Sequence, residues 1–166
     1  MIPDIKKILY ATDLSENARY AFGYAVNLAN RHDAKITVLY VVEELSSFAR
    51  SMVEDMLGEK RWTELRTENE AEIISDLKSR LDQFCSRIRT EQPHCPFEID
   101  KIVVVTGHPV DKIVQYAEEK DVDLIVIGSR GKGGLADVTM GTTSRRVLRR
   151  CSTPVLVVRL PEDQDA

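Results

Sequence analysis

Five short runs rich in valine, isoleucine and leucine alternate along the chain with segments whose apolar residues recur at helical spacing. Several runs are almost continuously apolar, which is typical of parallel strands covered on both faces. Right-handed crossovers through the intervening helices then predict a parallel sheet with helices on both faces. The predicted strands are Lys7–Ala11, Ile36–Val42, Ile99–Val105, Leu124–Ile127 and Val155–Val158.

Four helical segments separate the predicted strands. Ser15 is a plausible N-cap of the first, and Pro109 stands where the third should begin, because proline is favoured in the first turn. The order is therefore β-α-β-α-β-α-β-α-β, which indicates an α/β fold. The apolar stripes cover Ala18–Ala29, Ile74–Ile88, Pro109–Ala117 and Ser144–Arg150.

The stretch from Glu43 to about Thr67 lacks clear periodicity, most of all at its start. We interpret it either as a mobile loop leading into the second helix or as an extra helical turn or two. Trp62 and a nearby apolar group are expected in a local core or a dimer contact. The group comprises Met52, Met56 and Leu57.

A chain of 166 residues has the length of one ordinary domain. Its hydrophobic fraction of 43% and charged fraction of 30% exclude global disorder. We expect a single domain over residues 1–160, with the irregular segment at about 43–67 inside it and an acidic tail at 161–166.

Charge and composition exclude several functions. A net charge of −4, from 27 acidic and 23 basic residues, argues against a broad nucleic-acid-binding surface. No apolar run approaches the roughly 18–20 residues that span a bilayer, and the start resembles no signal peptide, so we expect a cytoplasmic protein without membrane insertion. Cys85, Cys95 and Cys151 are too few for a disulfide framework, and no zinc-ligand spacing is present.

The segment from Gly128 to Ser144 has the features of a ligand-binding loop. It follows a buried strand and precedes a helix, and open α/β sheets bind ligands at the carboxyl ends of their strands. Glycines let the backbone approach a ligand closely, and a helix start offers free N–H groups to phosphate. The glycines that matter are Gly128, Gly131 and Gly141, and hydroxyl donors follow at Thr142, Thr143 and Ser144.

Two common phosphate-binding motifs do not match this segment. The P-loop is absent because Gly133, rather than serine or threonine, follows Lys132. The dinucleotide fingerprint is matched only loosely by Gly131-x-Gly133-x-x-Ala136. It lies after the fourth strand, and no acidic residue stands about 20 positions further on.

The spacing Gly128-x2-Gly131-x9-Gly141-Thr142 resembles the signature of the universal stress protein family, in its ATP-binding branch. The resemblance covers nearly the whole chain except the segment from Glu43 to about Thr67. The other matching segments are Ile8–Ala18 with its Asp-x-Ser start, Gly107–Ile113, Asp123–Gly131 and Pro154–Val158.

The resemblance implies a single-domain, three-layer α/β/α fold of the adenine-nucleotide alpha hydrolase type, with strand order 3-2-1-4-5. It also implies a bound ATP, or AMP or ADP, whose phosphates Mg²⁺ or Mn²⁺ would bridge. Asp13 would bond the ribose hydroxyls, and Arg130 in the loop would neutralise phosphate. Adenine would contact Ala11, Thr12 and Val41, with Ile127 and Gly128 closing the pocket, and the phosphates would contact Gly131, Gly141, Thr142, Thr143 and Ser144.

Family members usually form homodimers through their last strand. In this chain that strand comprises Val155, Leu156, Val157 and Val158. Pairing is physically reasonable because an exposed apolar edge strand risks aggregation. The resemblance implies a nucleotide-dependent regulatory dimer in a stress response, read by a protein partner that the sequence does not identify. The alternatives are a weak ATPase and a nucleotide-independent dimeric scaffold.

Three residue groups keep two interpretations each. Asp13 by itself could be a helix-capping carboxylate, and His108 could be a solvated or capping histidine or a catalytic one. Four arginines could be a solvated helix end, or Arg145 or Arg146 among them could reach phosphates or the acidic surface of a partner. The four are Arg145, Arg146, Arg149 and Arg150.

Nothing in the sequence predicts a catalytic centre. There is no Ser/His/Asp arrangement, no clustered carboxylate pair and no base near the phosphate loop. We therefore expect no catalytic residues and at most slow ATP hydrolysis. The segment 43–67 stands beside the expected adenine pocket, which makes it a candidate lid.

Overall fold

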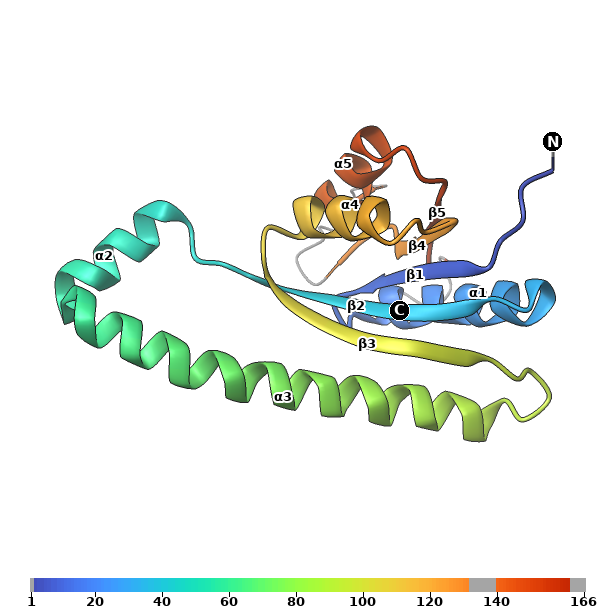
Figure 1. The fold of residues 1–166 in the computed structure, drawn as a ribbon, viewed down its shortest axis with the longest axis horizontal. Helices are drawn as coiled ribbons and strands as arrows, with labels where there is room; N and C mark the ends of the chain where they lie inside the picture. The colour runs from blue at the N-terminus through green and yellow to red at the C-terminus, as the bar shows by residue number, and fades with distance from the viewer. Residues whose placement is uncertain (1, 132–139, 162–166) are drawn as a thin grey trace.

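The computed structural model describes residues 2–131 and 140–161 and has a five-stranded parallel sheet with helices on both faces (Figure 1). The strand order β3-β2-β1-β4-β5 confirms the predicted topology. In chain order the elements are β1 Lys7–Thr12, α1 Glu16–His32, β2 Lys35–Glu43, α2 Ser47–Leu57, α3 Glu59–Glu91, β3 Glu98–Gly107, α4 Pro109–Glu119, β4 Leu124–Gly128, α5 Thr142–Arg150 and β5 Val155–Val158.

Strand β1 occupies the centre of the sheet, with β2 on one side and β4 on the other. Ile8 lies opposite Ile36 of β2 and opposite Leu124 of β4, and both pairs are parallel. The chain passes from β1 to β2 and β3 on one side of the sheet, and then crosses to β4 and β5 on the other side. This arrangement creates a topological switch point between the carboxyl ends of β1 and β4.

Alternate residues of β1 supply the two halves of the core. Tyr10 points toward α1 and α3, where its ring packs 4.9 Å from Phe22, and Phe22 packs 5.1 Å from Phe84. Leu9 points the other way, toward α4 and α5. Burial on both faces explains why the central strands are almost continuously apolar.

Two of the predicted helix starts are confirmed. The Ser15 hydroxyl accepts a hydrogen bond from the Ala18 N–H at 3.2 Å, and Pro109 is the first residue of α4. Both residues meet the needs of a first helical turn, in which the N–H groups have no intrahelical partner.

Most of residues 43–67 is helical, so the loop interpretation is wrong, and the alternative of an extra helical turn or two names the right structure but underestimates its length. Helix α2 begins after Ser46, whose hydroxyl accepts from the Ala49 N–H at 3.2 Å, and Gly58, with φ of 79°, separates it from α3. Helix α3 has 33 residues, or about 50 Å, so it extends well beyond the strands (Figure 1). Its first half has no sheet to cover, which explains why the core-facing period starts only near Ile74.

The described helices are each too short or too polar to cross a membrane. Of the predicted acidic tail, Pro161 is described and the remainder lies outside the described residues, as does the stretch 132–139 of the glycine loop.

Candidate functional site

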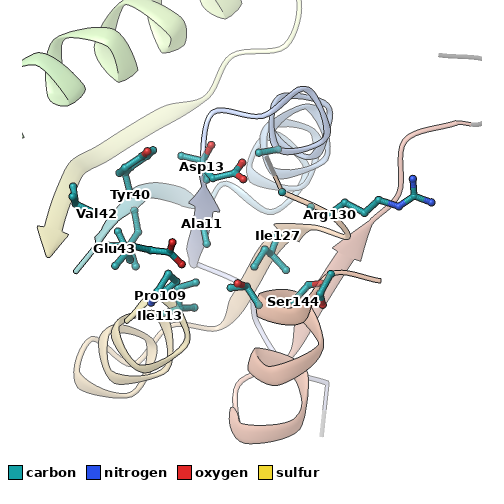
Figure 2. Close-up of a pocket in the computed structure, with 18 of the residues that line it drawn as sticks. Ala11, Asp13, Tyr40, Val42, Glu43, Pro109, Ile113, Ile127, Arg130 and Ser144 are labelled. Carbon is teal, nitrogen blue, oxygen red and sulfur yellow. The ribbon is translucent and has the colours of Figure 1, made fainter. Parts of the chain in front are cut away.

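A cavity of about 840 Å³ opens at the carboxyl ends of β1, β2 and β4 (Figure 2). The structure brings all twelve residues that the sequence predicted for nucleotide binding to its wall. They are Ala11, Thr12, Asp13, Val41, Ile127, Gly128, Arg130, Gly131, Gly141, Thr142, Thr143 and Ser144.

Asp13 follows β1 directly and is held by the turn into α1. Its Oδ1 accepts a hydrogen bond from the Ser15 N–H at 2.9 Å, while the Thr12 hydroxyl accepts from the Leu14 N–H at 3.0 Å. The helix cap itself is Ser15. Asp13 therefore fixes the turn before the cap, and it faces the cavity as well (Figure 2).

The three glycines of the loop stand where a side chain would have little room. A Cβ at Gly131 would overlap Oδ2 of Asp13, and a Cβ at Gly141 would lie 3.1 Å from the Ser129 carbonyl oxygen. At Gly128, a Cβ would lie 3.2 Å from the Ala18 nitrogen in the first turn of α1. The spacing of the motif thus reflects close approaches among β1, α1 and the loop.

Ser129 and Ser144 build the frame of the loop. The buried Ser144 hydroxyl lies 2.9 Å from the Ser129 carbonyl oxygen, to which it donates, and the Gly141 N–H donates to the same oxygen at 2.6 Å. The Asn17 side-chain amide of α1 donates to the Ser129 hydroxyl and to the Arg130 carbonyl, both at 3.1 Å. These bonds connect the loop to the start of α1 and to the start of α5.

The N-terminus of α5 opens at this loop. Gly141 is its N-cap and provides no side-chain hydrogen bond, and the Arg145 N–H donates to the Gly141 carbonyl at 3.2 Å. By helix geometry, the N–H groups of the three preceding residues have no intrahelical acceptor. Together with the positive end of the helix dipole, this arrangement suits an anion.

Helix α3 contributes a wall that the sequence analysis missed. Its residues at positions 73, 76, 77 and 80 share one face of the helix, which flanks the predicted apolar stripe. That spacing was a usable signal, but the helix could be placed at the cavity only from the structure. The cavity residues not predicted are Ala18, Leu39, Tyr40, Val42, Glu43, Ile73, Asp76, Leu77, Arg80, Pro109, Ile113 and Ser129.

Charged groups gather around Tyr40 at the end of β2. Burial of the Tyr40 phenol raises its pKa, the carboxylates of Asp13 and Glu43 raise it further, and Arg80 acts in the opposite direction. The Glu43 carboxylate points toward the space between β1 and α4, whereas the Arg130 guanidinium extends away from the other labelled side chains (Figure 2). The cavity therefore has mixed charge at its β2 and α3 side.

The two other ambiguous groups lie outside the cavity wall. His108 precedes α4, with its Nδ1 3.7 Å from Asp111, and Asp111 accepts a hydrogen bond from Arg150 at 2.6 Å. All four arginines at positions 145, 146, 149 and 150 are exposed on α5, and the cavity wall includes none of them. The structure therefore favours the solvated-helix interpretation for the arginines.

Within residues 2–131 and 140–161, no three histidine, cysteine or acidic side chains come together as a metal site.

A parallel five-stranded sheet of this order, with a glycine-lined cavity at its switch point, defines a protein of the open-sheet α/β class. Residues 4–159 match the universal stress protein family, and the chain belongs to that family.

Known relatives are similar to this chain over almost its full length. Universal stress protein MJ0531 of Methanocaldococcus jannaschii is 32% identical over 162 residues, covering 96% of this chain and 85% of that protein. MJ0577 of the same organism is 31% identical, covering 93% and 94%, and its solved structure has a TM-score of 0.75 at 26% identity, covering 96% and 99%. An Arabidopsis thaliana family protein, solved with AMP bound, shares the fold at 20% identity and a TM-score of 0.58, covering 97% and 95%.

Proposed function

We propose that this chain binds ATP, or AMP or ADP, in the cavity at the β1–β4 switch point and acts as a nucleotide-dependent regulatory dimer in a stress response. One observation carries the proposal. Asp13, the three loop glycines and the first turn of α5 converge on a single cavity. A carboxylate suits ribose hydroxyls, and a helix N-terminus beside glycines suits phosphate.

The proposed orientation places the nucleotide along the cavity from β2 to α5. Adenine lies at the β2 side against Val41, Ala11 and Thr12, the ribose hydroxyls bond Asp13, and Ile127 and Gly128 close the space between base and sugar. The phosphates lie at Gly131, Gly141, Thr142, Thr143 and Ser144, with Arg130 close by. Since the Ser144 hydroxyl already donates within the loop, its backbone N–H is the donor proposed for phosphate.

Mg²⁺ or Mn²⁺ would neutralise the phosphates in this arrangement. The described residues supply no cluster of acidic ligands, which agrees with an ion held mainly by phosphate oxygens and water. The AMP-bound Arabidopsis protein supports a mononucleotide in this fold.

Dimerisation through β5 is the second part of the proposal. Within the described residues β5 pairs with β4, and its other edge has no strand beside it. Two copies that pair along Val155–Val158 would cover both apolar edges. The dimer would present a nucleotide-dependent surface to a protein partner.

The two alternatives make different demands on the site. A weak ATPase needs a base beside the terminal phosphate. Among the described residues the acidic side chains of the cavity wall are Asp13, which is proposed to bond ribose, and Glu43 and Asp76, which come from β2 and α3 on the adenine side. A nucleotide-independent scaffold does not need a carboxylate, a glycine loop and a helix N-terminus gathered at one cavity.

Calorimetric titration with ATP and Mg²⁺ tests the proposal. We expect wild type to bind and the Gly131→Ala, Gly141→Ala double variant to lose binding, because new methyl groups would meet Asp13 and the Ser129 carbonyl. Gly23→Ala is the matched control, since a Cβ there has no neighbour within 4 Å. Absence of binding by wild type would leave the scaffold as the better explanation.

A further inference from the structure

Helix α2 presents large apolar side chains to solvent. Phe48, Met52 and Met56 follow one another at four-residue spacing and are 76%, 51% and 81% exposed. We call these three residues the α2 stripe. Within α2 no residue is buried, and the helix lies beyond the sheet at the far end of α3 (Figure 1).

The half-buried residues of α2 are Ala49, Val53 and Glu54, and Arg50 lies beside Glu54. Arg50 and Glu54, an ion pair at 2.8 Å, lie about 160° from Met52 around the helix axis. Both line a second cavity of about 700 Å³, together with Trp62 on α3. A surface helix normally directs its apolar face to the body and its charges to water. In α2 only Ala49 and Val53 of the apolar side chains at positions 48, 49, 52, 53 and 56 are half-buried, and the stripe faces solvent.

The area of the stripe fits a small protein interface. Three side chains of this size and exposure present on the order of 400 Å² of apolar surface, which is at the level that marks an interaction site on a monomer. Two such faces would bury on the order of 800 Å² in total, below a standard interface and in the range of weak, reversible association.

The stripe is complementary to itself. Phe48 and Met56 stand four residues before and four residues after Met52. In an antiparallel pair related by a two-fold axis at Met52, Phe48 of each copy packs on Met56 of the other. Contacts between sulfur and an aromatic ring are favourable, and a two-fold interface uses the same patch on both copies.

The charge beside the stripe fits the same pairing. Asp55 lies about 60° from Met52 around the helix, at the edge of the stripe. Antiparallel pairing places Asp55 of the second copy level with Ala49, in a first turn that contains no acidic residue. The carboxylate then faces the positive end of the partner helix. We infer that α2 is a self-association surface, whose partner is α2 of a second copy in antiparallel orientation.

Charge reversal at the two-fold axis tests this inference. Sedimentation equilibrium over a wide range of concentration would compare wild type with Met52→Glu, Met52→Lys and an equimolar mixture of the two variants. At high concentration we expect each variant alone to have about half the mass of wild type, because like charges meet at the axis, and the mixture to recover it. Ile2→Glu is the control for an exposed apolar residue elsewhere and should keep the wild-type mass.

The comparison separates this surface from pairing through β5. If β5 also pairs, the variants fall to the β5 dimer rather than to the monomer, whereas wild type, whose β5 dimer carries two α2 stripes, has a larger mass that rises with concentration. Equal masses of wild type and variants at every concentration would overturn the inference. Reduced masses without recovery in the mixture would overturn it as well, because they would exclude contact between the two Met52 positions. Circular dichroism checks that α2 remains helical.

Discussion

Gly131 lies against the carboxylate of Asp13, so closely that a side-chain carbon at position 131 would overlap Oδ2. The other oxygen, Oδ1, accepts the Ser15 N–H at 2.9 Å. The carboxylate is thus located from one side by the turn after β1 and from the other by the loop after β4. This contact joins the two strand ends that form the switch point.

Replacement of Asp13 tests its role toward ribose. For Asp13→Ala we expect ATP affinity to fall about 10- to 100-fold, the loss of about 1.5–3 kcal/mol typical of hydrogen bonds to a charged group. Affinity for 2′,3′-dideoxy-ATP should be the same in both proteins, because this nucleotide has no hydroxyls for the carboxylate. Titration of both nucleotides into both proteins measures the difference.

If Asp13→Ala lost affinity equally for ATP and for the dideoxy nucleotide, Asp13 would not act through the ribose hydroxyls. The carboxylate would then act only through the turn that it holds at Ser15. Thermal unfolding of the variant without nucleotide shows how much that turn contributes to stability.

The parallel sheet follows from local patterns together with general rules, whereas its strand order was predicted from the resemblance to the universal stress protein family. Strand-length apolar runs predicted all five strands, and Ser15 and Pro109 predicted two helix starts. The glycine spacing predicted the loop, and the structure brought those residues to one cavity. Local sequence was sufficient there because each residue has a steric or capping reason to be where it is.

The helices at 47–91 were harder to predict. The four-residue spacing of Phe48, Met52 and Met56 is itself a helical signal that the sequence analysis missed. The cavity wall from α3 was missed for a different reason. Asp76 and Arg80 belong to the cavity through the tertiary packing of α3 beside β2 and β3, which spacing along the chain does not encode.

Replacement of Phe22 tests the packing of the core between α1 and the sheet. Its ring is fully buried and lies 4.9 Å from that of Tyr10, 5.1 Å from Phe84 and 5.7 Å from Phe97. We expect Phe22→Ala to lower the free energy of unfolding by about 3–5 kcal/mol through lost burial and a cavity. Urea denaturation measures this change in the free energy of unfolding. Tyr24→Ala, an exposed change on the same helix, should cost about 1 kcal/mol or less, and similar losses for both variants would contradict the assigned core.

The Cys85 thiol should be unreactive in the folded protein. Burial raises the pKa of its thiol to about 11, so at pH 8 it remains protonated and unreactive. Cys95 and Cys151 are partly exposed. With an aromatic disulfide reagent, we expect two thiols to react in the native state and the third only on unfolding. In Cys85→Ser the native count should stay at two, and a fall to one would mean that Cys85 is accessible.

The Asp111–Arg150 pair connects α4 to α5 and should make stability depend on pH. The hydrogen bond from Arg150 lowers the pKa of the Asp111 carboxyl below its ordinary value. A carboxyl with a lowered pKa in the folded state stabilises the protein above its ordinary pKa, and this contribution is lost as pH falls through the lowered value. Asp111→Asn should therefore reduce the melting temperature slightly at pH 7, because both side chains are exposed, and should have no effect in acid. Thermal melts at several pH values, for wild type, Asp111→Asn, Arg150→Gln and the double variant, isolate the pair. A coupling that is unchanged from neutral to acidic pH would show that the contact is not ionic.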